Sequence, residues 1–574
     1  MLKIKQLIAQ NVHSSVLGIN PAAELTVDDL AGMLEYPPDA SMGDLALPCF
    51  KLSKSLRRAP VMIAQALADG MSCPCVESAE AVNGYLNIRL SPAYLVSDVL
   101  SEVLEKKERY GAPNVGCGKK VVLDYSSPNV AKPFHIGHLG TTVIGHALKK
   151  MHEFAGYECF GINYLGDWGT QFGKLILAYN TWGSKEMVEE GGIDTLVELY
   201  VKINNAITEE KEQGKTELAD AARAEFHKME MGDEHNLALW KWFIQISLEE
   251  YEKTYKQLGI TFDSYLGESF YTDKMPAQVQ KLRDMGLLKL DDGASIVDLD
   301  EHGMPPCLIL KRDGSTLYPT RDIAAAVYRK ENYHFDKCIY VTSTQQILHF
   351  KQWFKVVELM GYDWHDQLVH VPYGTVSIGG AKLATRTGNV VLLRDLFGAA
   401  IDKVTEIMEE KNPDMKGRAD VAEAVGVGAI VFYYLTNNRI KDIDFIMDDA
   451  LSFDGNTGPY VQYTYARACS VLEKAGESTA TDFVITAPEE QALLKVLATY
   501  EEKVLMALRD YEPSVITRFI LDVAVAFNRF YHNCRILSES DESIKQTRIA
   551  LTLATKHVLG SAFEMICLKK TEKI

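Results

Sequence analysis

The segment that most constrains the fold is residues 121–150, where a short apolar run is followed by a turn and then by a helical pattern. Residues 121–123 predict a buried parallel strand. Residues 126–129 are rich in turn formers, Pro133 breaks the chain again, and apolar residues recur at helical spacing from Gly137 onward. A strand, a tight loop and a helix form the first crossover of a doubly wound α/β sheet, in which ligands bind beyond the carboxyl ends of the strands.

The start of the predicted helix is a candidate anion site, because the first N–H groups of a helix are unpaired and its dipole is positive at that end. His135 and His138 lie there. Two histidines at this spacing ordinarily mark a surface helix start, but the preceding strand and Ser-Pro-Asn turn favour nucleotide binding. The sequence contains no GxGxxG or Walker loop, so phosphate groups must be bound in another way.

The length of 574 residues suggests roughly three or four domains, and 47% hydrophobic with 24% charged residues is typical of a soluble globular protein. No run of 18 apolar residues occurs, and the N-terminus is too polar for a signal peptide. We therefore expect neither membrane insertion nor secretion. The ten cysteines lack framework spacing, and Cys73 and Cys75 are too close for a zinc knuckle, which predicts free thiols in a reducing cytosol.

The net charge of −18 is not the usual signature of a nucleic-acid-binding protein. Local patches decide binding, however, because salt at about 0.15 M screens fields beyond roughly 8 Å. Lys51, Lys54 and Arg58 would share one face of a helix predicted over residues 51–58. A solvated surface is the ordinary interpretation of such a face.

Secondary-structure patterns organise the rest of the chain. Residues 1–110 form a first unit, with helices predicted over 3–16 and 60–67 and a strand over 83–89. The long, charged helical stretch 181–264 interrupts the alternation of strands and helices and is predicted to be an insertion. Further strands are predicted over 156–163, 308–310, 338–342 and 368–373, and further helices over 322–330, 345–360, 396–411, 421–435, 458–474, 489–510 and 513–537.

Four motifs carry a family resemblance. The His-Ile-Gly-His sequence after a strand and a proline resembles the first signature of class I aminoacyl-tRNA synthetases. The chain resembles the arginyl-tRNA synthetases in particular, over essentially its whole length, through SSPNVAKPFHIGH, NYLGDWGTQFGKL, YPTRDIAAAVYR and FDGNTGPYVQYTYAR. The resemblance implies a ligase that converts arginine and ATP, with Mg²⁺, to arginyl-adenylate and pyrophosphate. It would then esterify the 3′-terminal adenosine of its tRNA, and activation would itself require bound tRNA.

The resemblance also implies a multidomain α/β fold, with a doubly wound, Rossmann-like catalytic core, an N-terminal α+β domain and an all-α C-terminal helical bundle. We expect a domain that binds the tRNA elbow at residues 1–112 and a catalytic domain at 113–390, with its insertion at about 181–264. A helical connecting region at 391–450 and an anticodon-binding domain at 451–574 would follow. A cytoplasmic monomer without a protein-built metal site is expected.

Activation of an amino acid concentrates negative charge in the transition state, so catalysis should depend on positioning and electrostatics. His135 and His138 would donate hydrogen bonds to ATP, and Gly137 would leave space for the adenine. Lys132, three residues before the first histidine, is a further cation for the phosphates.

The second class I signature is represented by a degenerate loop. Lys382 and Arg386 remain as two cations that could hold the leaving pyrophosphate. The customary second lysine is replaced by Thr385, and the resemblance implies that Lys132 supplies the missing charge.

A guanidinium substrate requires a fork of planar acceptors in a partly desolvated pocket. Tyr318 and Asp322 would lie on one side of a helix at i, i+4 spacing. Glu268 and Gln346 match the other pocket positions of the family, and Asn129 matches the residue that holds the backbone groups of the substrate. Each of these residues alone would be interpreted as structural, but together they form a pocket suited to arginine.

The candidate tRNA contacts combine cations with rings that can stack on bases. The tyrosines among them could equally be core residues. The set is Lys51, Lys54, Arg58, Tyr460, Gln462, Tyr463, Arg467, Asn528, Arg529 and Tyr531.

Two alternatives stay open at this point. The first is a class I synthetase for another amino acid, although the cysteinyl and methionyl enzymes usually carry metal-binding Cys/His sets that this chain lacks. The second is a catalytically silent paralogue that serves as an RNA-binding scaffold, which the degenerate loop would permit.

Overall fold

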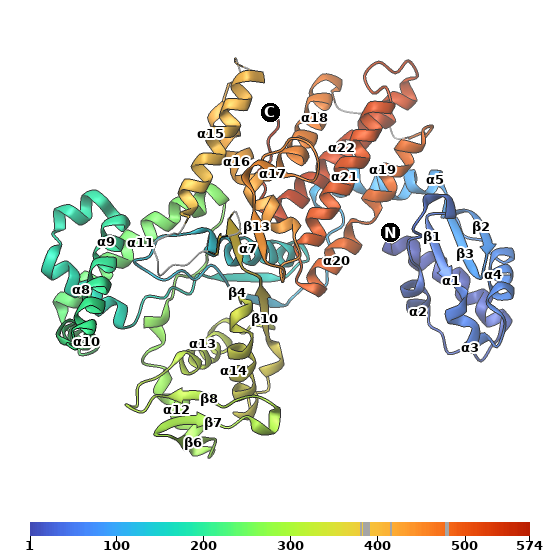
Figure 1. Ribbon diagram of the computed structural model, residues 1–574. Coiled ribbons are helices and arrows are strands. Elements are labelled where there is room, and N and C mark those ends of the chain that lie inside the picture. The colour runs from blue at the N-terminus through green and yellow to red at the C-terminus, as the bar shows by residue number, and fades with distance from the viewer. Residues whose placement is uncertain (379–380, 383–390, 412, 414–415, 477–481) are drawn as a thin grey trace.

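A computed structural model describes residues 1–378, 381–382, 391–411, 413, 416–476 and 482–574. Its centre is a parallel sheet with the strand order β10-β9-β4-β5 (Figure 1). All neighbouring strands pair in parallel, which confirms the predicted doubly wound core. The strands are β4 (Lys120–Asp124), β5 (Glu158–Ile162), β9 (Lys337–Ser343) and β10 (Leu368–Tyr373).

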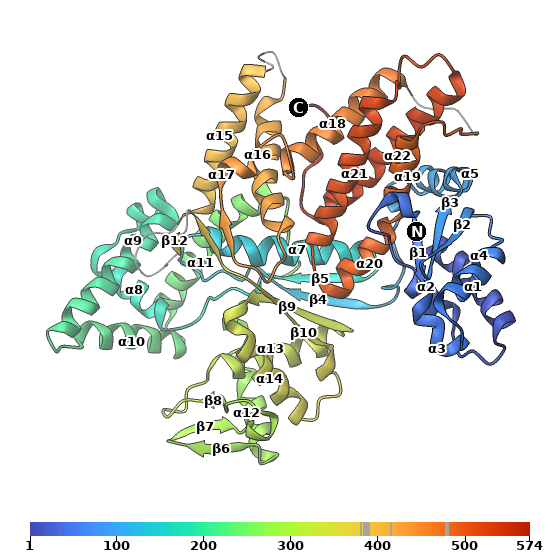
Figure 2. The same ribbon diagram turned by 45° about the vertical axis from the view of Figure 1, so that its right-hand side comes forward.

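Both faces of this sheet are buried, which explains the near-continuous apolar character of β4. Val121 and Leu123 belong to the hydrophobic cluster that includes α7 (Leu139–Phe154), whereas Val122 packs in a second cluster with α13 (Tyr318–Tyr333) and α14 (Ile347–Leu359). Successive strand residues point to opposite faces, so one apolar run serves both clusters. Figure 2 shows α7 above the sheet and α13 and α14 below it.

Four helices form the insertion after β5 and have a hydrophobic cluster of their own around Phe172, Leu196 and Phe243. A left-handed φ of 57° at Gly192 interrupts the second of them. The helices are α8 (Thr170–Trp182), α9 (Lys185–Glu212), α10 (Glu217–Glu230) and α11 (Glu234–Leu258).

A short antiparallel sheet lies between the insertion and α13, in the order β6-β7-β8. The strand predicted over 308–310 belongs to this sheet and not to the parallel core. The elements of this region are η6 (Glu268–Tyr271), α12 (Met275–Asp284), β6 (Leu288–Asp291), β7 (Ala294–Val297) and β8 (Cys307–Leu310).

The N-terminal unit is a three-stranded antiparallel sheet covered by helices, in agreement with the predicted α+β character. The helix predicted over 51–58 is confirmed only in part: the chain is helical in η2 (Cys49–Leu52) and α3 (Ser53–Leu56), but Arg57 ends α3 with a φ of 51°. Arg58 therefore does not continue the face of Lys51 and Lys54. The other elements are α1 (Leu2–Ile19), α2 (Val27–Met33), β1 (Leu45–Pro48), α4 (Pro60–Asp69), β2 (Val76–Val82), β3 (Tyr85–Leu90), α5 (Pro92–Tyr94) and α6 (Ser101–Lys106).

The C-terminal part is helical, as predicted, although the predicted helix over 489–510 is divided at Thr499 and the one predicted over 513–537 ends at Asn533. The helices are α15 (Leu393–Lys411), α16 (Arg418–Thr436), α17 (Met447–Ala450), α18 (Gly458–Ala475), α19 (Pro488–Ala498), α20 (Tyr500–Asp510), α21 (Ser514–Asn533) and α22 (Glu542–Met565). A small sheet joins β11 (Val376–Ile378), β12 (Ala381–Lys382) and β13 (Ile443–Phe445).

One described helix, α16, has the length and apolar composition of a membrane span. Its apolar window is 67% buried inside the protein, where it packs against α15, α18 and α21. Such burial is typical of a core helix in a domain built around it.

Candidate active site

The turn that follows the first strand fixes both signature histidines through hydrogen bonds to their own backbone. The Gly137 N–H donates to His135 Nδ1 at 3.0 Å, and the His135 N–H donates to His138 Nδ1 at 3.2 Å. Since each Nδ1 accepts a hydrogen bond, each imidazole carries its proton on Nε2. The two rings lie 3.9 Å apart between centroids, immediately before α7.

Both imidazoles are held neutral. Burial, together with the nearby Lys132, lowers the pKa of His135 to about 4. Burial also lowers the pKa of His138 well below its ordinary value, with added repulsion from His135 and Lys132. The ring of His138 stacks on Phe134 with a centroid distance of 5.1 Å and an interplanar angle of 3°. The pair therefore offers two Nε2–H donors rather than two positive charges.

Gly137 also makes room for the first signature histidine. A side chain at this position would meet His135 Cε1 at 2.8 Å and Nδ1 at 2.9 Å. The missing Cβ thus lets the His135 ring fold back onto the Gly137 amide, and the expected role of Gly137 toward adenine stays a prediction.

Helix α11 holds the loop that leads from β4 to the histidines. Ser247 accepts the Ala131 N–H at 3.0 Å, and the Tyr251 hydroxyl contacts the carbonyl oxygens of Asn129 at 2.9 Å and Lys132 at 2.7 Å. The Tyr255 hydroxyl bonds Ser126 Oγ at 2.7 Å. Ser247, Tyr251 and Tyr255 follow one another at i+4 spacing, so a single face of α11 contacts the loop along its length.

The segment after the second signature also contacts the turn. The Ile136 N–H donates to the Val391 carbonyl at 3.2 Å, and the Leu393 N–H donates to the Phe134 carbonyl at 2.9 Å. Lys382 pairs with Ser377 through the backbone of β12. The Lys382 side chain and Arg386 lie outside the described part of the chain, so their predicted roles stay predictions.

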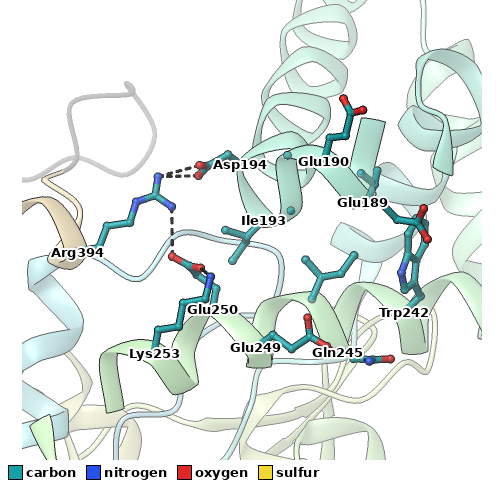
Figure 3. Close-up of a pocket in the computed structure, with 14 residues that line it drawn as sticks. Glu189, Glu190, Ile193, Asp194, Trp242, Gln245, Glu249, Glu250, Lys253 and Arg394 are labelled. Carbon is teal, nitrogen blue, oxygen red and sulfur yellow. Dashed lines mark hydrogen bonds and ion pairs between the residues drawn. The ribbon is translucent and has the colours of Figure 1, made fainter. Parts of the chain in front are cut away.

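A cavity of about 470 Å³ lies beside this segment, between α9, α11 and the start of α15 (Figure 3). In Figure 3, Arg394 reaches across it to Asp194 at 2.8 Å and Glu250 at 3.3 Å. Glu189, Glu190 and Glu249 add carboxylates to its wall. This lining would repel a triphosphate, so the cavity is not a candidate for the ATP site.

Glu268 is positioned at the start of η6 by a buried carboxylate. Asp167 accepts the Ser269 N–H at 2.8 Å and the Ser269 hydroxyl at 2.6 Å, and a Cβ on Gly267 would collide with it. Glu268 itself forms an ion pair with Arg321. The pKa of Glu268 is raised to about 7, because burial and the like charges of Asp322 and Asp167 outweigh the opposing effect of Arg321.

Asp322 also has an internal partner, His349 on α14, whose Nε2 lies 2.6 Å from Asp322 Oδ2. Both sequence-predicted carboxylates thus meet where the N-terminal end of α13 approaches η6, and each influences the other electrostatically. Tyr318 is 66% exposed on the same helix. Gln346 is exposed in η8 (Thr344–Gln346), beyond the carboxyl end of β9, and Asn129 is exposed beyond the carboxyl end of β4.

Sequence reasoning missed a fully buried arginine behind this pocket. Arg329 pairs with Asp124 at 2.8 Å, and its guanidinium lies within 6.0 Å of the ring centroids of Tyr164, Tyr271 and Tyr340. Asp124 in turn accepts the Ser127 hydroxyl at 2.9 Å, which ties the end of β4 to the turn. The one sequence signal for this pair is the charged residue Asp124 at the end of an apolar strand.

The candidate tRNA residues separate into exposed and buried groups. Tyr463 and Tyr531 flank the Arg467 guanidinium at 5.0 and 4.8 Å from their ring centroids, beside an open groove of about 350 Å³. Arg529 and the three N-terminal cations Lys51, Lys54 and Arg58 are exposed.

Two candidate residues face inward instead. Asn528 Nδ2 donates to the Tyr460 hydroxyl at 3.0 Å. Gln462 is 0% exposed and donates to the carbonyls of Ala424 and Lys569, so the expectation that it contacts tRNA is wrong: the residue fastens α18 to the end of the chain.

Among the described residues, no group of three or more His, Cys, Asp or Glu side chains is placed to hold a metal ion. That part of the chain therefore does not fit a protein-built Mg²⁺ site, and no step of the reaction is assigned to the ion.

Comparisons with known proteins agree with this architecture. The family described as tRNA synthetases class I (R), catalytic domain, matches residues 99–447. The DALR anticodon binding domain matches residues 461–574, and the arginyl tRNA synthetase N terminal domain matches residues 2–90.

The relatives include arginine–tRNA ligases of Alkaliphilus metalliredigens, 47% identical over 100% of both chains, and of Clostridioides difficile, 49% identical over 96% of this chain and 97% of the relative. The solved arginyl-tRNA synthetase of Thermus thermophilus superposes with a TM-score of 0.83 at 25% identity and covers 98% of this chain and 99% of its own. With a family model over more than half of its length and relatives of this identity over nearly all of it, the chain belongs to the class I arginyl-tRNA synthetases.

Proposed function

We propose that this arginine–tRNA ligase activates its substrate at the carboxyl edge of the β10-β9-β4-β5 sheet. ATP would lie on the His135–His138 turn, and arginine would lie between Asn129 and the carboxylates of Glu268 and Asp322. One observation carries the assignment: two neutral imidazole donors and two neighbouring carboxylates are collected at the same edge of one parallel sheet, where such folds bind ligands.

In the first step, the arginine carboxylate attacks the α-phosphorus of ATP, the bond to the bridging oxygen breaks, and pyrophosphate leaves. His135 and His138 donate Nε2–H hydrogen bonds to the phosphate oxygens where negative charge grows. Lys132 adds a positive charge near both rings. Lys382 and Arg386 are proposed to hold the pyrophosphate. No protein side chain is needed as a nucleophile.

In the second step, a hydroxyl of the terminal tRNA adenosine attacks the carbonyl carbon of the adenylate, and AMP leaves with its electron pair. In both steps the arginine guanidinium is bound by Glu268 and Asp322. Tyr318 and Gln346 would line the rim of the pocket, and Asn129 would bind the backbone groups of the substrate. A fork of carboxylate oxygens matches a guanidinium and leaves acceptors unpaired around an ammonium.

Transfer RNA is proposed to contact both ends of the chain. Tyr463, Arg467 and Tyr531 form an exposed cation–aromatic cluster suited to unstacked bases, with Arg529 nearby in sequence. Tyr460 and Asn528 would support this cluster from within. Lys51, Lys54 and Arg58 are proposed to contact the backbone of the tRNA elbow.

The domain limits proposed from the sequence are 1–112, 113–390 with the insertion at about 181–264, 391–450 and 451–574. We also propose that Mg²⁺ arrives on the phosphates of ATP, that the enzyme is a cytoplasmic monomer without a membrane partner, and that arginine activation requires bound tRNA.

ATP–pyrophosphate exchange with each of the twenty amino acids, with and without tRNA, tests the reaction. We expect exchange with arginine and with no other amino acid, and only when tRNA is present. Asp322→Ala tests the pocket: its arginine KM should rise steeply and the arginine/lysine ratio should narrow, because half of the fork is lost. Asp284→Ala removes a carboxylate on α12 that accepts from Gln280 and serves as the control. An unchanged arginine KM in Asp322→Ala would place the guanidinium elsewhere.

A further inference from the structure

Each proposed acceptor carboxylate is held on one oxygen by a nitrogen group of the protein itself. Arg321 contacts Glu268 through Oε2, and His349 contacts Asp322 through Oδ2. In the described part of the chain, no second residue forms a hydrogen bond or ion pair with either side-chain carboxylate. The Arg321 and Glu268 side chains are only 12% and 15% exposed, so their contact is shielded from solvent.

We propose that Arg321 is a positioning residue for arginine recognition, which holds one oxygen of Glu268 and keeps this carboxylate ionised, so that the other oxygen accepts the substrate guanidinium. The inference rests on the proposed assignment of Glu268 to the arginine site. Arg321 would not touch the substrate and would act entirely through its partner.

Electrostatics explains why Glu268 needs such a partner. Asp322 at the start of α13 and Asp167 after β5 face it with like charge, Tyr164 adds a buried hydroxyl, and Arg321 is the opposing cation. Burial and the two aspartates raise the Glu268 pKa, and even with Arg321 opposing them it is about 7. Without Arg321, the carboxyl would be protonated at neutral pH and would present an O–H donor to a guanidinium, which can only donate.

The position of Arg321 also bears on whether it supports Glu268 or competes with the substrate for it. Arg321 Nε is buried without a hydrogen-bond partner among the described residues, and the guanidinium lies 5.8 Å from the exposed Tyr318 ring. A resident arginine that merely occupied the substrate position would have to leave on binding, and its removal would lower the arginine KM. The proposal requires that removal of Arg321 raise the arginine KM.

The test compares Arg321→Gln, Arg321→Lys, Glu268→Gln and the Arg321→Gln/Glu268→Gln double variant in pyrophosphate exchange at saturating ATP and tRNA. Arg321→Gln should raise the arginine KM about tenfold at pH 7.5, with kcat and the ATP KM nearly unchanged, because losing the opposing cation raises the Glu268 pKa above about 7 and leaves its carboxyl mostly protonated. Arg321→Lys keeps the charge without the planar fork and should raise KM only about threefold.

The pH profile and the double variant separate positioning from a general structural role. In Arg321→Gln, the rise of the arginine KM should begin at a higher pH than in the unmodified enzyme, and Arg321→Lys should restore the original profile. The double variant should be no worse than Glu268→Gln alone, because Arg321 acts through Glu268. Arg548→Gln breaks an equally buried pair with Glu490, 2.7 Å long, between α22 and α19. This matched control should lower Tm and leave the arginine KM unchanged.

A lowered or unchanged arginine KM in Arg321→Gln would overturn the inference, as would additive effects in the double variant. If Glu268→Gln raised KM while Arg321→Gln did not, only the inference would fall. If Glu268→Gln left KM unchanged, the proposed arginine site would fall with it. Should Arg321→Gln not fold, Arg321→Lys decides, because a KM at or below that of the unmodified enzyme contradicts the proposal.

Discussion

At the scale of single residues, the signature histidines act through hydrogen bonds and not through charge, because each Nδ1 is already engaged by a backbone N–H. His138→Ala should slow adenylation by about 2–4 kcal/mol of transition-state free energy, as for loss of one oxyanion donor. The arginine KM should change little. His146→Ala is the control: it removes a buried imidazole within α7 that is bonded to the Tyr125 hydroxyl at 3.1 Å, and it should lower Tm without this loss of kcat. Wild-type exchange rates in His138→Ala would contradict the assignment.

The titration of Glu268 gives a second prediction at this scale. Its pKa is raised to about 7, chiefly by burial, so the ionised acceptor form dominates above that pH and is lost as the pH falls. At pH 6 the arginine KM should therefore be about tenfold higher than at pH 8. His135, with a pKa near 4, should add no break to kcat across this range. Exchange kinetics from pH 5.5 to 8.5 measure both quantities.

The control for this pH dependence is Glu268→Gln, in which the arginine KM should be high and nearly independent of pH. A sloping profile that persisted in this variant would assign the titration to another group.

The residues that could be named from the sequence are those at the ends of strands, where a topological rule fixes their location. His135 falls in this class, whereas Asn129 and Gln346 were named through the family resemblance, although both also lie beyond strand ends in the structure. Arg321 and His349 could not be named, because their importance comes from pairing with Glu268 and Asp322 across 53 and 27 positions of the chain. Gln462 was misjudged because a glutamine in a helix carries no signal that distinguishes an exposed amide from one buried against two carbonyl groups.

At the scale of elements, α11 connects the insertion to the catalytic loop. Tyr251 is 0% exposed, its hydroxyl contacts two loop carbonyls, and its ring lies 5.3 Å from that of Phe134, on which His138 stacks. Tyr251→Phe removes only the hydroxyl. We expect a free-energy loss of about 1 kcal/mol in folding, together with a drop of several-fold in the kcat of exchange, because the loop loses its alignment.

Tyr500→Phe is the matched control for this prediction. Tyr500 is equally buried, and its hydroxyl bonds Ser561 at 2.8 Å within the C-terminal helices. The two variants should lose similar stability in thermal unfolding, but only Tyr251→Phe should lose kcat. Equal activities would show that the α11 contact is structural alone.

Elements whose apolar residues form a clear run or stripe in the sequence were predicted well, and one helix whose buried face mixes polar with apolar residues was not. The strands β9 and β10 and the helices α14 and α16 stand out as apolar runs or stripes. Helix α22 was missed because threonines are buried among its apolar residues and interrupt the apolar pattern. Thr552 and Thr555 satisfy their hydroxyls by donating to carbonyls four residues earlier, which permits burial without a distant partner.

At the scale of the whole molecule, the N-terminal unit docks on the C-terminal helices through a small set of charged groups. Glu502 on α20 bonds Lys5 at 2.8 Å and the Tyr36 hydroxyl at 2.5 Å, and Lys495 on α19 bonds Asp44 at 2.6 Å. The two proposed tRNA-contacting units are therefore in direct contact, and their relative orientation depends on this interface.

Glu502→Gln should loosen this docking while leaving the catalytic site intact. Loss of a charged hydrogen-bond acceptor costs about 1–2 kcal/mol, so the tRNA KM in aminoacylation should rise by about fivefold to thirtyfold. The arginine and ATP KM values at saturating tRNA should not change. Glu501→Gln, on the same helix, forms no hydrogen bond or ion pair with the N-terminal unit in the described part of the chain and is the control.

The docking should also respond to acid in a defined direction. Burial raises the pKa of Glu502, but the hydrogen bonds from Lys5 and Tyr36 outweigh it, and the net pKa lies below the ordinary value of 4.5. A lowered pKa in the folded state means that the contact is fully stabilising above pH 4.5 and weakens as the pH falls through the folded-state value. Limited proteolysis of the segment between β3 and β4 should therefore accelerate in acid for the unmodified enzyme, and already at neutral pH for Glu502→Gln. If both proteins were cleaved equally at neutral pH, Glu502 would not control the docking, and the orientation of the N-terminal unit would depend on other contacts such as Lys495 with Asp44.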